Sequence, residues 1–376
     1  MGIAKMKKPT FHANGHIQFD VVEHVAEYLA LEEEWGRLWA RCDGQSDESF
    51  NFCRRCLTNN SSGEKSRLLC VTGRQNGTLI LVWPLTISKR GLWRVARPLS
   101  GGAVDYTVFL VDTIDGARDI TLAALKVIMA RSRADILSLP YIREDRPLYA
   151  LFPRPKSFSL VTGDCAPIVL LKNEPDWESF IKGLRSKPSK HPKEFLRRLG
   201  REGHVALNIY GRDDRLHCEK FVDWIFLHKA RWAKRAGKYG HWLDSSDYRN
   251  LLVSLLQSSM PSEPYWLLVV TLNERPLAAC MVGEGRSIAH LIITAFDDAY
   301  AKLSPGSAMM ESLVRWAFDR RIDLDLGVGD EPYKRYWSKD NLVRTVSLTV
   351  PLSAWGGAAL LSKRILSSTH KQDKKN

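Results

Sequence analysis

Apolar positions follow two spacings along the chain, and the first half begins with a helical one. Residues 25–42 carry apolar side chains at intervals of three or four, which predicts an amphipathic helix. Within residues 67–85, two apolar runs flank Asn76-Gly77 and predict a β-hairpin. A second helix is expected over residues 120–133, followed by a short buried strand over 135–139.

The second half repeats this order. Residues 266–282 are again two apolar runs around a turn, and 288–296 form a third run. A helix expected over 307–321 then leads into the apolar segment 323–326. The repetition predicts a duplicated α/β unit, with coincidence among short apolar strings as the competing interpretation.

Length and composition agree with two folded domains. The chain has 376 residues, 44% of them hydrophobic, and twelve Trp, a composition that excludes intrinsic disorder. Gly and Pro cluster near 159–175, where we expect the boundary between the halves. The predicted domains are an N-terminal one over 17–160, a C-terminal one over 161–352 and a basic tail over 353–376.

The charge balance favours anionic partners without choosing among them. The 55 basic and 42 acidic side chains give a net charge of +13, which suits nucleic acid, a membrane surface or phosphorylated ligands. Part of the excess lies in residues 185–201, where Lys190, Arg197 and Arg198 are candidate contacts to an acceptor or to RNA. A solvated basic face is the alternative. Pro188 and Pro192 exclude a continuous helix through this stretch.

The cysteines and the ends of the sequence point to a reducing cytoplasm. The seven Cys are an odd number, and Cys53-Arg-Arg-Cys56 has no second pair at zinc spacing, so we expect buried thiols and no metal site. No apolar segment follows the basic first residues, and no run of about 18 apolar residues exists, so neither a signal peptide nor a membrane span is expected.

One helix start has the composition of an anion site. After the apolar run that ends at Phe296, Ser304 is positioned to cap a helix that begins with Pro305. Gly306, Ser307 and Ala308 then belong to the first turn, where unpaired backbone N–H groups and the helix dipole favour a pyrophosphate. A helix start without a ligand is the alternative interpretation.

The segment 323–337 adds candidate chemistry. A buried strand opens into a glycine loop that carries acids, a lysine and aromatic side chains, and strand ends of this kind are a usual place for a site. The candidates are Asp330, Glu331, Tyr333, Lys334 and Trp337.

Together these pieces resemble a known family. The order of strand, Leu-Ser-Pro-Gly helix and the string Gly-x-Gly-x-Glu-x-Tyr-Lys-x-x-Trp over 327–337 is similar to the CelD/BcsL-like acetyltransferases, a GNAT branch related to the Fem peptidyltransferases. The match covers residues 19–349. The resemblance implies an α/β fold of tandem GNAT-like domains, with mixed central sheets flanked by helices and acyl-CoA bound to the C-terminal one.

The resemblance also implies roles for the site residues. The group near Gly306, including Ser304, Ser307 and Ala308, would hold the donor pyrophosphate. Lys334 would steady the carbonyl of the transferred group, and Tyr333 would protonate the leaving thiolate. Either Asp330 or Glu331 is a candidate to accept the acceptor's proton.

A helix in the second half supplies candidate acceptor contacts. His228, Arg231 and Trp232 share one helical face and are candidates to line an acceptor cleft, together with Trp337. A histidine buried in the core is the alternative.

We therefore expect a cytoplasmic acyltransferase that moves an acyl group directly from acyl-CoA to an amine or hydroxyl, such as a saccharide precursor of a polysaccharide or of the cell envelope. No Cys or Ser lies in a nucleophile motif. A Fem-like transferase that uses aminoacyl-tRNA and a non-catalytic scaffold of a polysaccharide-synthesis system are the alternatives. The acceptor, the acyl chain and the oligomeric state stay open.

Overall fold

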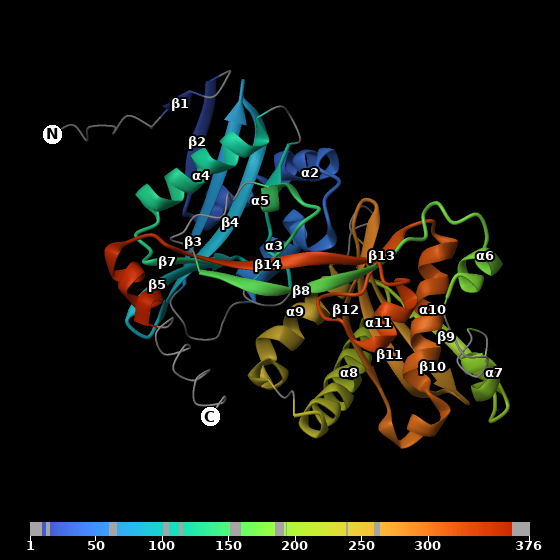
Figure 1. Cartoon of the computed structure of the whole chain (residues 1–376). Helices are drawn as coiled ribbons and strands as arrows, with labels where there is room; N and C mark the ends of the chain where they lie inside the picture. The colour runs from blue at the N-terminus through green and yellow to red at the C-terminus, as the bar shows by residue number, and fades with distance from the viewer. Residues whose placement is uncertain are drawn as a thin grey trace, which may run out of the picture. The chain divides into compact units, whose positions relative to one another are not determined.

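The computed structural model describes residues 10–12, 16–59, 66–100, 105–112, 116–150, 159–184, 192, 194–237, 240–258 and 264–362. The chain forms two compact units, drawn in Figure 1. Unit 1 comprises residues 1–42, 62–163 and 344–376, and unit 2 comprises 43–61 and 164–343.

Unit 1 is a mostly antiparallel sheet with helices packed on it. Its strands follow the order β1-β2-β3-β4-β5-β7-β14, and β6 pairs with β4. The strands are β1 (Thr10–His12), β2 (His16–Val22), β3 (Arg67–Gln75), β4 (Thr78–Arg90), β5 (Trp93–Pro98), β6 (Leu110–Val111), β7 (Ile136–Arg143) and β14 (Leu342–Pro351). The helices are α1 (Val25–Leu29), α2 (Glu32–Arg41), α4 (Ala117–Arg131) and α5 (Pro147–Ala150).

Unit 2 repeats the plan. Its strands follow the order β8-β13-β12-β11-β10-β9. The strands are β8 (Ser159–Val169), β9 (Val205–Tyr210), β10 (Tyr265–Leu272), β11 (Arg275–Glu284), β12 (Ile288–Phe296) and β13 (Asp323–Asp325). The helices are α3 (Phe50–Thr58), α6 (Trp177–Lys182), α7 (Glu194–Gly200), α8 (Arg215–Arg235), α9 (Ser246–Gln257), α10 (Pro305–Asp319) and α11 (Pro332–Trp337), with short 3₁₀ turns at Ser46–Glu48, His241–Asp244 and Asp298–Leu303.

The predicted duplication is confirmed by the strand pairing. In each unit an antiparallel meander ends in one parallel pair, β5 with β7 in unit 1 and β12 with β13 in unit 2. The connecting helix is α4 in the first case and α10 in the second. The predicted hairpin at Asn76-Gly77 is also confirmed, with both residues at positive φ, as a two-residue turn of this type requires.

The predicted helix over 25–42 is divided into α1 and α2. The Leu31 N–H donates to the Tyr28 carbonyl, three residues back, which tightens the chain and ends the first helix. The break lets two fully buried rings, Tyr28 and Trp35, meet edge to face with their centroids 5.7 Å apart. Hydrophobic spacing alone could not show it, because both helices bury the same face.

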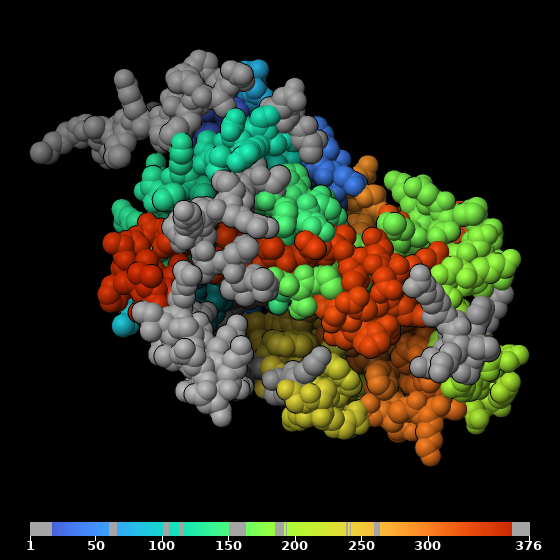
Figure 2. Space-filling model, viewed as in Figure 1, coloured from blue at the N-terminus to red at the C-terminus, as the bar shows by residue number. Residues whose placement is uncertain are grey.

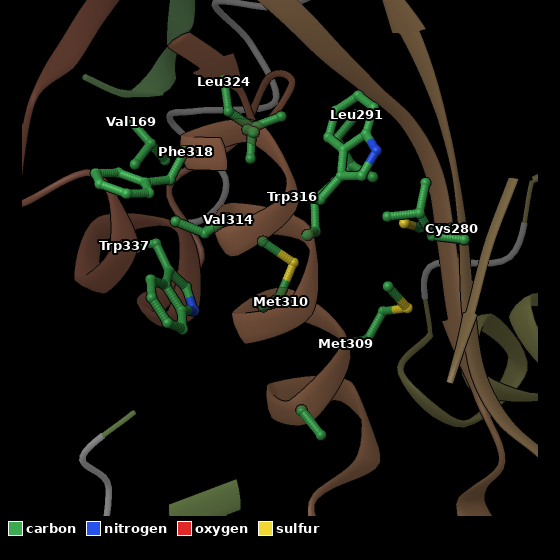
Figure 3. Packing of buried hydrophobic residues seen from close by; sticks show 14 of the residues in the cluster. Val169, Cys280, Leu291, Met309, Met310, Val314, Trp316, Phe318, Leu324 and Trp337 are labelled. Carbon is green, nitrogen blue, oxygen red and sulfur yellow. The ribbon is translucent and has the colours of Figure 1, made fainter. Parts of the chain in front are cut away.

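The core of unit 2 lies between its sheet and α10. Leu268 and Val270 of β10 join the side chains of α10 in one buried cluster, whereas Leu267 and Val269 are equally buried but lie outside it. The strand is therefore covered on both faces, which explains its continuous apolar sequence. Figure 3 shows part of this cluster, with Trp337 beside Met310 and Val314 of α10. No helix in the described residues is long and apolar enough to cross a membrane.

Truncation of Leu324 tests this core. Its side chain is fully buried on β13 within the α10 cluster, so Leu324→Ala is expected to lower the free energy of unfolding of unit 2 by about 2–5 kcal/mol. Urea titrations followed by circular dichroism would measure the change. The control Leu216→Ala removes a side chain that is 84% exposed and is expected to change stability by less than about 0.5 kcal/mol. Equal losses for the two variants would contradict the described packing.

Candidate functional site

The site begins where two parallel strands of unit 2 separate. Only residues 288–290 of β12 pair with β13, at residues 323–325. The β11–β12 register then shifts so that Ile292 has no partner across the strands, which is a β-bulge. Beyond the bulge, β12 continues to Phe296 with β11 on one side, and no described strand pairs with its other edge. This edge presents backbone groups to a ligand.

A cavity of about 1380 Å³ lies at this opening. The end of β12, the start of α10 and the helix α11 form much of its wall, and α7 and α8 contribute the remaining aromatic and basic groups. The lining residues are Gly183, Phe195, Arg198, Lys229, Trp232, Thr294, Ala295, Phe296, Ala301, Ser304, Pro305, Gly306, Ser307, Met310, Glu331, Pro332, Tyr333, Arg335, Tyr336, Trp337, Lys339 and Asp340.

The start of α10 differs in detail from the sequence prediction. Pro305 is the first helical residue, as predicted, but Ser304 adopts a left-handed conformation (φ 57°, ψ 49°) and its side chain makes no cap. A capping serine needs an extended backbone, which explains the difference. The Ser304 carbonyl instead accepts the N–H groups of Ser307 and Ala308, at 3.0 and 3.2 Å. Within the described residues, the Gly306 N–H has no hydrogen-bond partner, and it is the group that an anion can reach.

Three of the four predicted donor contacts line the cavity. These are Ser304, Gly306 and Ser307, whereas Ala308 is fully buried behind them. A Cβ atom added at Gly306 would lie 3.2 Å from the Phe296 ring, so this glycine allows the helix start and the end of β12 to approach closely.

The loop after β13 is held by a buried lysine. The Lys334 Nζ donates to the carbonyls of Val328 (2.7 Å) and Gly327 (3.3 Å) and lies 3.2 Å from the Glu331 carboxylate. The Asp325 carboxylate also accepts the Gly327 N–H at 2.8 Å. Lys334 is buried and is not among the residues that line the cavity. Its ammonium therefore fixes the shape of the loop and the direction of Glu331.

Glu331 and Tyr333 both face the cavity. Gly329 has a φ of 116°, and a Cβ atom there would lie 2.7 Å from a Glu331 carboxylate oxygen, so the loop needs glycine at this position. Tyr333 is 38% exposed on the concave wall, yet many protein atoms surround its ring. Burial and the neighbouring Glu331 charge raise the pKa of Tyr333 above its usual value. The phenol therefore stays protonated at neutral pH and can donate a proton.

Asp330, the other candidate base, points elsewhere. It is exposed, it does not line the cavity, and it accepts a hydrogen bond from Arg335 Nη2 at 2.9 Å. Arg335, which does line the cavity, also lies 3.5 Å from the Asp340 carboxylate.

The structure brings some predicted acceptor contacts together and leaves others apart. Arg198, Trp232 and Trp337 line the cavity. Arg197 is exposed and forms an ion pair with Glu194, and Arg231 is exposed on α8. Lys190 lies outside the described residues.

His228 is a core residue. It is 5% exposed, its ring lies 4.1 Å from that of Trp224, and it does not line the cavity. Its Nδ1 is 3.9 Å from the Asp297 carboxylate. Burial lowers the pKa of His228, and the Asp297 charge opposes that effect only in part.

Several cavity residues were not predicted. Lys229 precedes Trp232 by three residues on α8, and its Nζ lies 4.8 Å from the centre of the indole. Helical spacing could have placed it beside Trp232. Arg335 occupies a variable position of the glycine-loop string, and Lys339 follows that string, so neither carried a signal.

The C-x-x-C segment on α3 holds two buried, free thiols, and burial raises the pKa of Cys56. Among the described residues, no three His, Cys, Asp or Glu side chains are grouped so that they could hold a metal ion.

Comparisons with known proteins agree with this geometry. Residues 187–335 match the family model described as acetyltransferase (GNAT) domain. No curated protein matches the sequence. The chain carries a GNAT domain that includes the glycine loop, the start of α10 and the end of β12.

Solved structures extend the likeness to the whole chain. FemX is 12% identical, with 88% of this chain and 97% of that one covered and a TM-score of 0.57. A tandem GNAT protein from the clavulanic acid biosynthesis pathway is 11% identical, with 89% and 99% covered and a TM-score of 0.51. A conserved protein of unknown function from Bacteroides thetaiotaomicron is 10% identical, with 89% and 100% covered and a TM-score of 0.51. The fold is that of tandem GNAT proteins.

The burial of His228 predicts a pH-dependent stability. The unfolded chain takes up a proton at this residue below about pH 6.5, whereas the folded protein resists it because its pKa is lowered. Stability is therefore greatest above that pH and falls on acidification. Urea midpoints measured at about pH 7.5 and pH 5.5 should differ more for the wild type than for His228→Gln. The same acid sensitivity in both proteins would show that another group causes it.

Proposed function

We propose that this protein is an acyltransferase that moves an acetyl or other acyl group from acyl-CoA to an amine or hydroxyl acceptor. The observation that carries the proposal is the meeting of three features in one cavity of the GNAT domain: the open edge of β12, the start of α10, and the pair Glu331 and Tyr333. By the resemblance of its glycine loop to the CelD/BcsL-like family, we further propose a saccharide acceptor.

The cavity fits the chemistry of an acyl-CoA donor. The free Gly306 N–H and the helix dipole favour a phosphate group at the start of α10. Arg198, Lys229, Arg335 and Lys339 add positive charge to the same wall. The unpaired edge of β12 can receive the amide groups of the pantetheine arm, as an exposed sheet edge receives a peptide strand.

Glu331 and Tyr333 supply the proton transfers. Glu331 accepts the proton of the acceptor as its nitrogen or oxygen attacks the thioester carbonyl carbon. Tyr333 donates its phenolic proton to the sulfur as the carbon–sulfur bond breaks, so that the thiol leaves neutral. Lys334 keeps Glu331 aimed at the cavity through the Gly327 and Val328 carbonyls, which supports a positioning role for this lysine.

The remaining basic residues are assigned to the acceptor. Arg197 and Arg231 are exposed outside the cavity, where a large anionic acceptor could reach them. We keep Trp232 and Trp337 as acceptor contacts because both line the cavity.

Donor binding is tested by calorimetric titration with acetyl-CoA and with free CoA. We expect a dissociation constant of about micromolar order for the wild type. Gly306→Glu should weaken binding at least about tenfold, because it crowds Phe296 and places a negative charge where the phosphates bind. Gly36→Glu is the matched control, since Gly36 lies on α2 of unit 1 with open space around it.

Two further results would favour the alternatives. Salt-sensitive binding of aminoacyl-tRNA without binding of CoA would support a Fem-like transferase. A folded protein that binds neither CoA nor aminoacyl-tRNA would support the scaffold.

The proton-transfer roles are tested by single substitutions. With a panel of amino sugars and polyamines as acceptors, CoA release from acetyl-CoA should fall about 10²-fold in kcat for both Tyr333→Phe and Glu331→Gln. Tyr300→Phe is the control, because Tyr300 lies outside the cavity and its ring contact with Arg275 survives the change. Full activity in Tyr333→Phe and Glu331→Gln would refute the assigned roles even if acetyl-CoA binds.

A further inference from the structure

Unit 1 carries an exposed apolar patch that the proposed reaction does not use. The patch comprises Leu92 in the β4–β5 turn, Trp93 beside it, and Trp355 and Leu361 on the helix over 354–362. Leu92 is 70% exposed, Trp355 53% and Leu361 62%, and the rings of Trp93 and Trp355 stack with centroids 6.0 Å apart. The helix is the red segment at the left of Figure 2, on the surface of the unit. Large side chains gathered in this way mark an interaction surface.

The patch is held on the sheet of unit 1. The Asp135 carboxylate accepts hydrogen bonds from the Arg94 N–H and the Ser353 hydroxyl, and the Asp135 carbonyl accepts the Leu352 N–H. A Cβ atom at Gly356 would lie 1.9 Å from the Asp135 carbonyl oxygen, so glycine is needed for the helix to pack this closely. Leu92 and Trp355 are therefore presented by a fixed scaffold.

The charges around the patch identify its partner. Lys89 and Arg90 are exposed on β4, two and three residues before Leu92. In the sequence, Lys363 and Arg364 follow directly after the helix, and no Asp or Glu occurs from residue 342 to residue 372. Apolar and Trp side chains flanked by cations, without acids, have the composition of segments that lie in the interface of an anionic bilayer.

We propose that this patch binds the surface of an anionic lipid bilayer. Leu92, Trp355 and Leu361 enter the headgroup region, and the neighbouring basic side chains contact lipid phosphates. The helix over 354–362 is too short to span a membrane, so the contact is interfacial.

The test is sedimentation of the full chain with lipid vesicles. Vesicles of phosphatidylcholine containing about a third phosphatidylglycerol should bind the protein well above vesicles of phosphatidylcholine alone, and high salt should reduce the difference. The double variant Leu92→Ser with Leu361→Ser should lower the partition coefficient about tenfold. Leu216→Ser is the matched control, since it removes an equally exposed leucine from unit 2, and it should bind like the wild type.

Three results would overturn the proposal. One is no preference for phosphatidylglycerol, and another is an equal loss of binding in Leu216→Ser. The third is a change from dimer to monomer in the double variant without lipid, measured by analytical ultracentrifugation, which would make the patch an interface between two copies. The single variant Leu361→Ser, with circular dichroism as a check on folding, separates loss of binding from loss of structure. None of these readouts depends on acyl transfer.

Discussion

The early end of one parallel strand pair determines where the chemistry of this protein can occur. β12 and β13 share only three residue pairs before they separate, because β13 stops at Asp325 and the chain turns at Gly327, which has a φ of 74°. Had β13 continued, its backbone groups would have paired with the edge of β12. The separation instead leaves that edge open and directs the following loop over the start of α10. The cavity, the position of Glu331 and the accessible Gly306 N–H all depend on it.

A short polar network stabilises the turn against closure. The Asp325 carboxylate and the Lys334 ammonium satisfy backbone groups at Gly327 and Val328 that a longer strand would have satisfied by pairing. Buried backbone groups without partners cost free energy, so the loop can replace strand only where side chains supply such partners. Lys334 thus contributes to the site through the backbone, although its type and position in the sequence suggest a direct contact with the transferred group.

Much of the fold was readable from the sequence because local signals and tertiary packing agree. The run over 288–296 became β12 with the same bounds, and Asn76-Gly77 became the expected turn. Other features had no local signal. β14 follows α11 of unit 2 in the chain yet pairs with β7 of unit 1, and residues 43–61 belong to unit 2. Apolar spacing tells which face of an element is buried, but not which sheet the element joins.

For the site, the residue types were informative and their directions were not. Ser304, Gly306, Glu331 and Tyr333 were read from the string of residues and line the cavity, whereas Asp330 turns to Arg335 and His228 enters the core. Adjacent residues at a helix start point in directions about 100° apart, so one of two neighbouring acids faces the ligand and the other faces solvent. A sequence motif cannot decide which, because the answer depends on where the loop places the first turn of α11.

The duplication shows why only one unit is expected to carry the reaction. In unit 1 the parallel pair of β5 and β7 corresponds to that of β12 and β13, but β7 runs on from Ile136 to Arg143 and pairs along its length with β14. At the place where unit 2 has its glycine loop, unit 1 has Pro140, Tyr141 and a buried Arg143 that binds Asp145 at 2.6 Å. Unit 1 thus continues its strand where unit 2 opens its sheet. The same plan therefore yields a closed sheet in one unit and a cavity with positioned acid and base groups in the other.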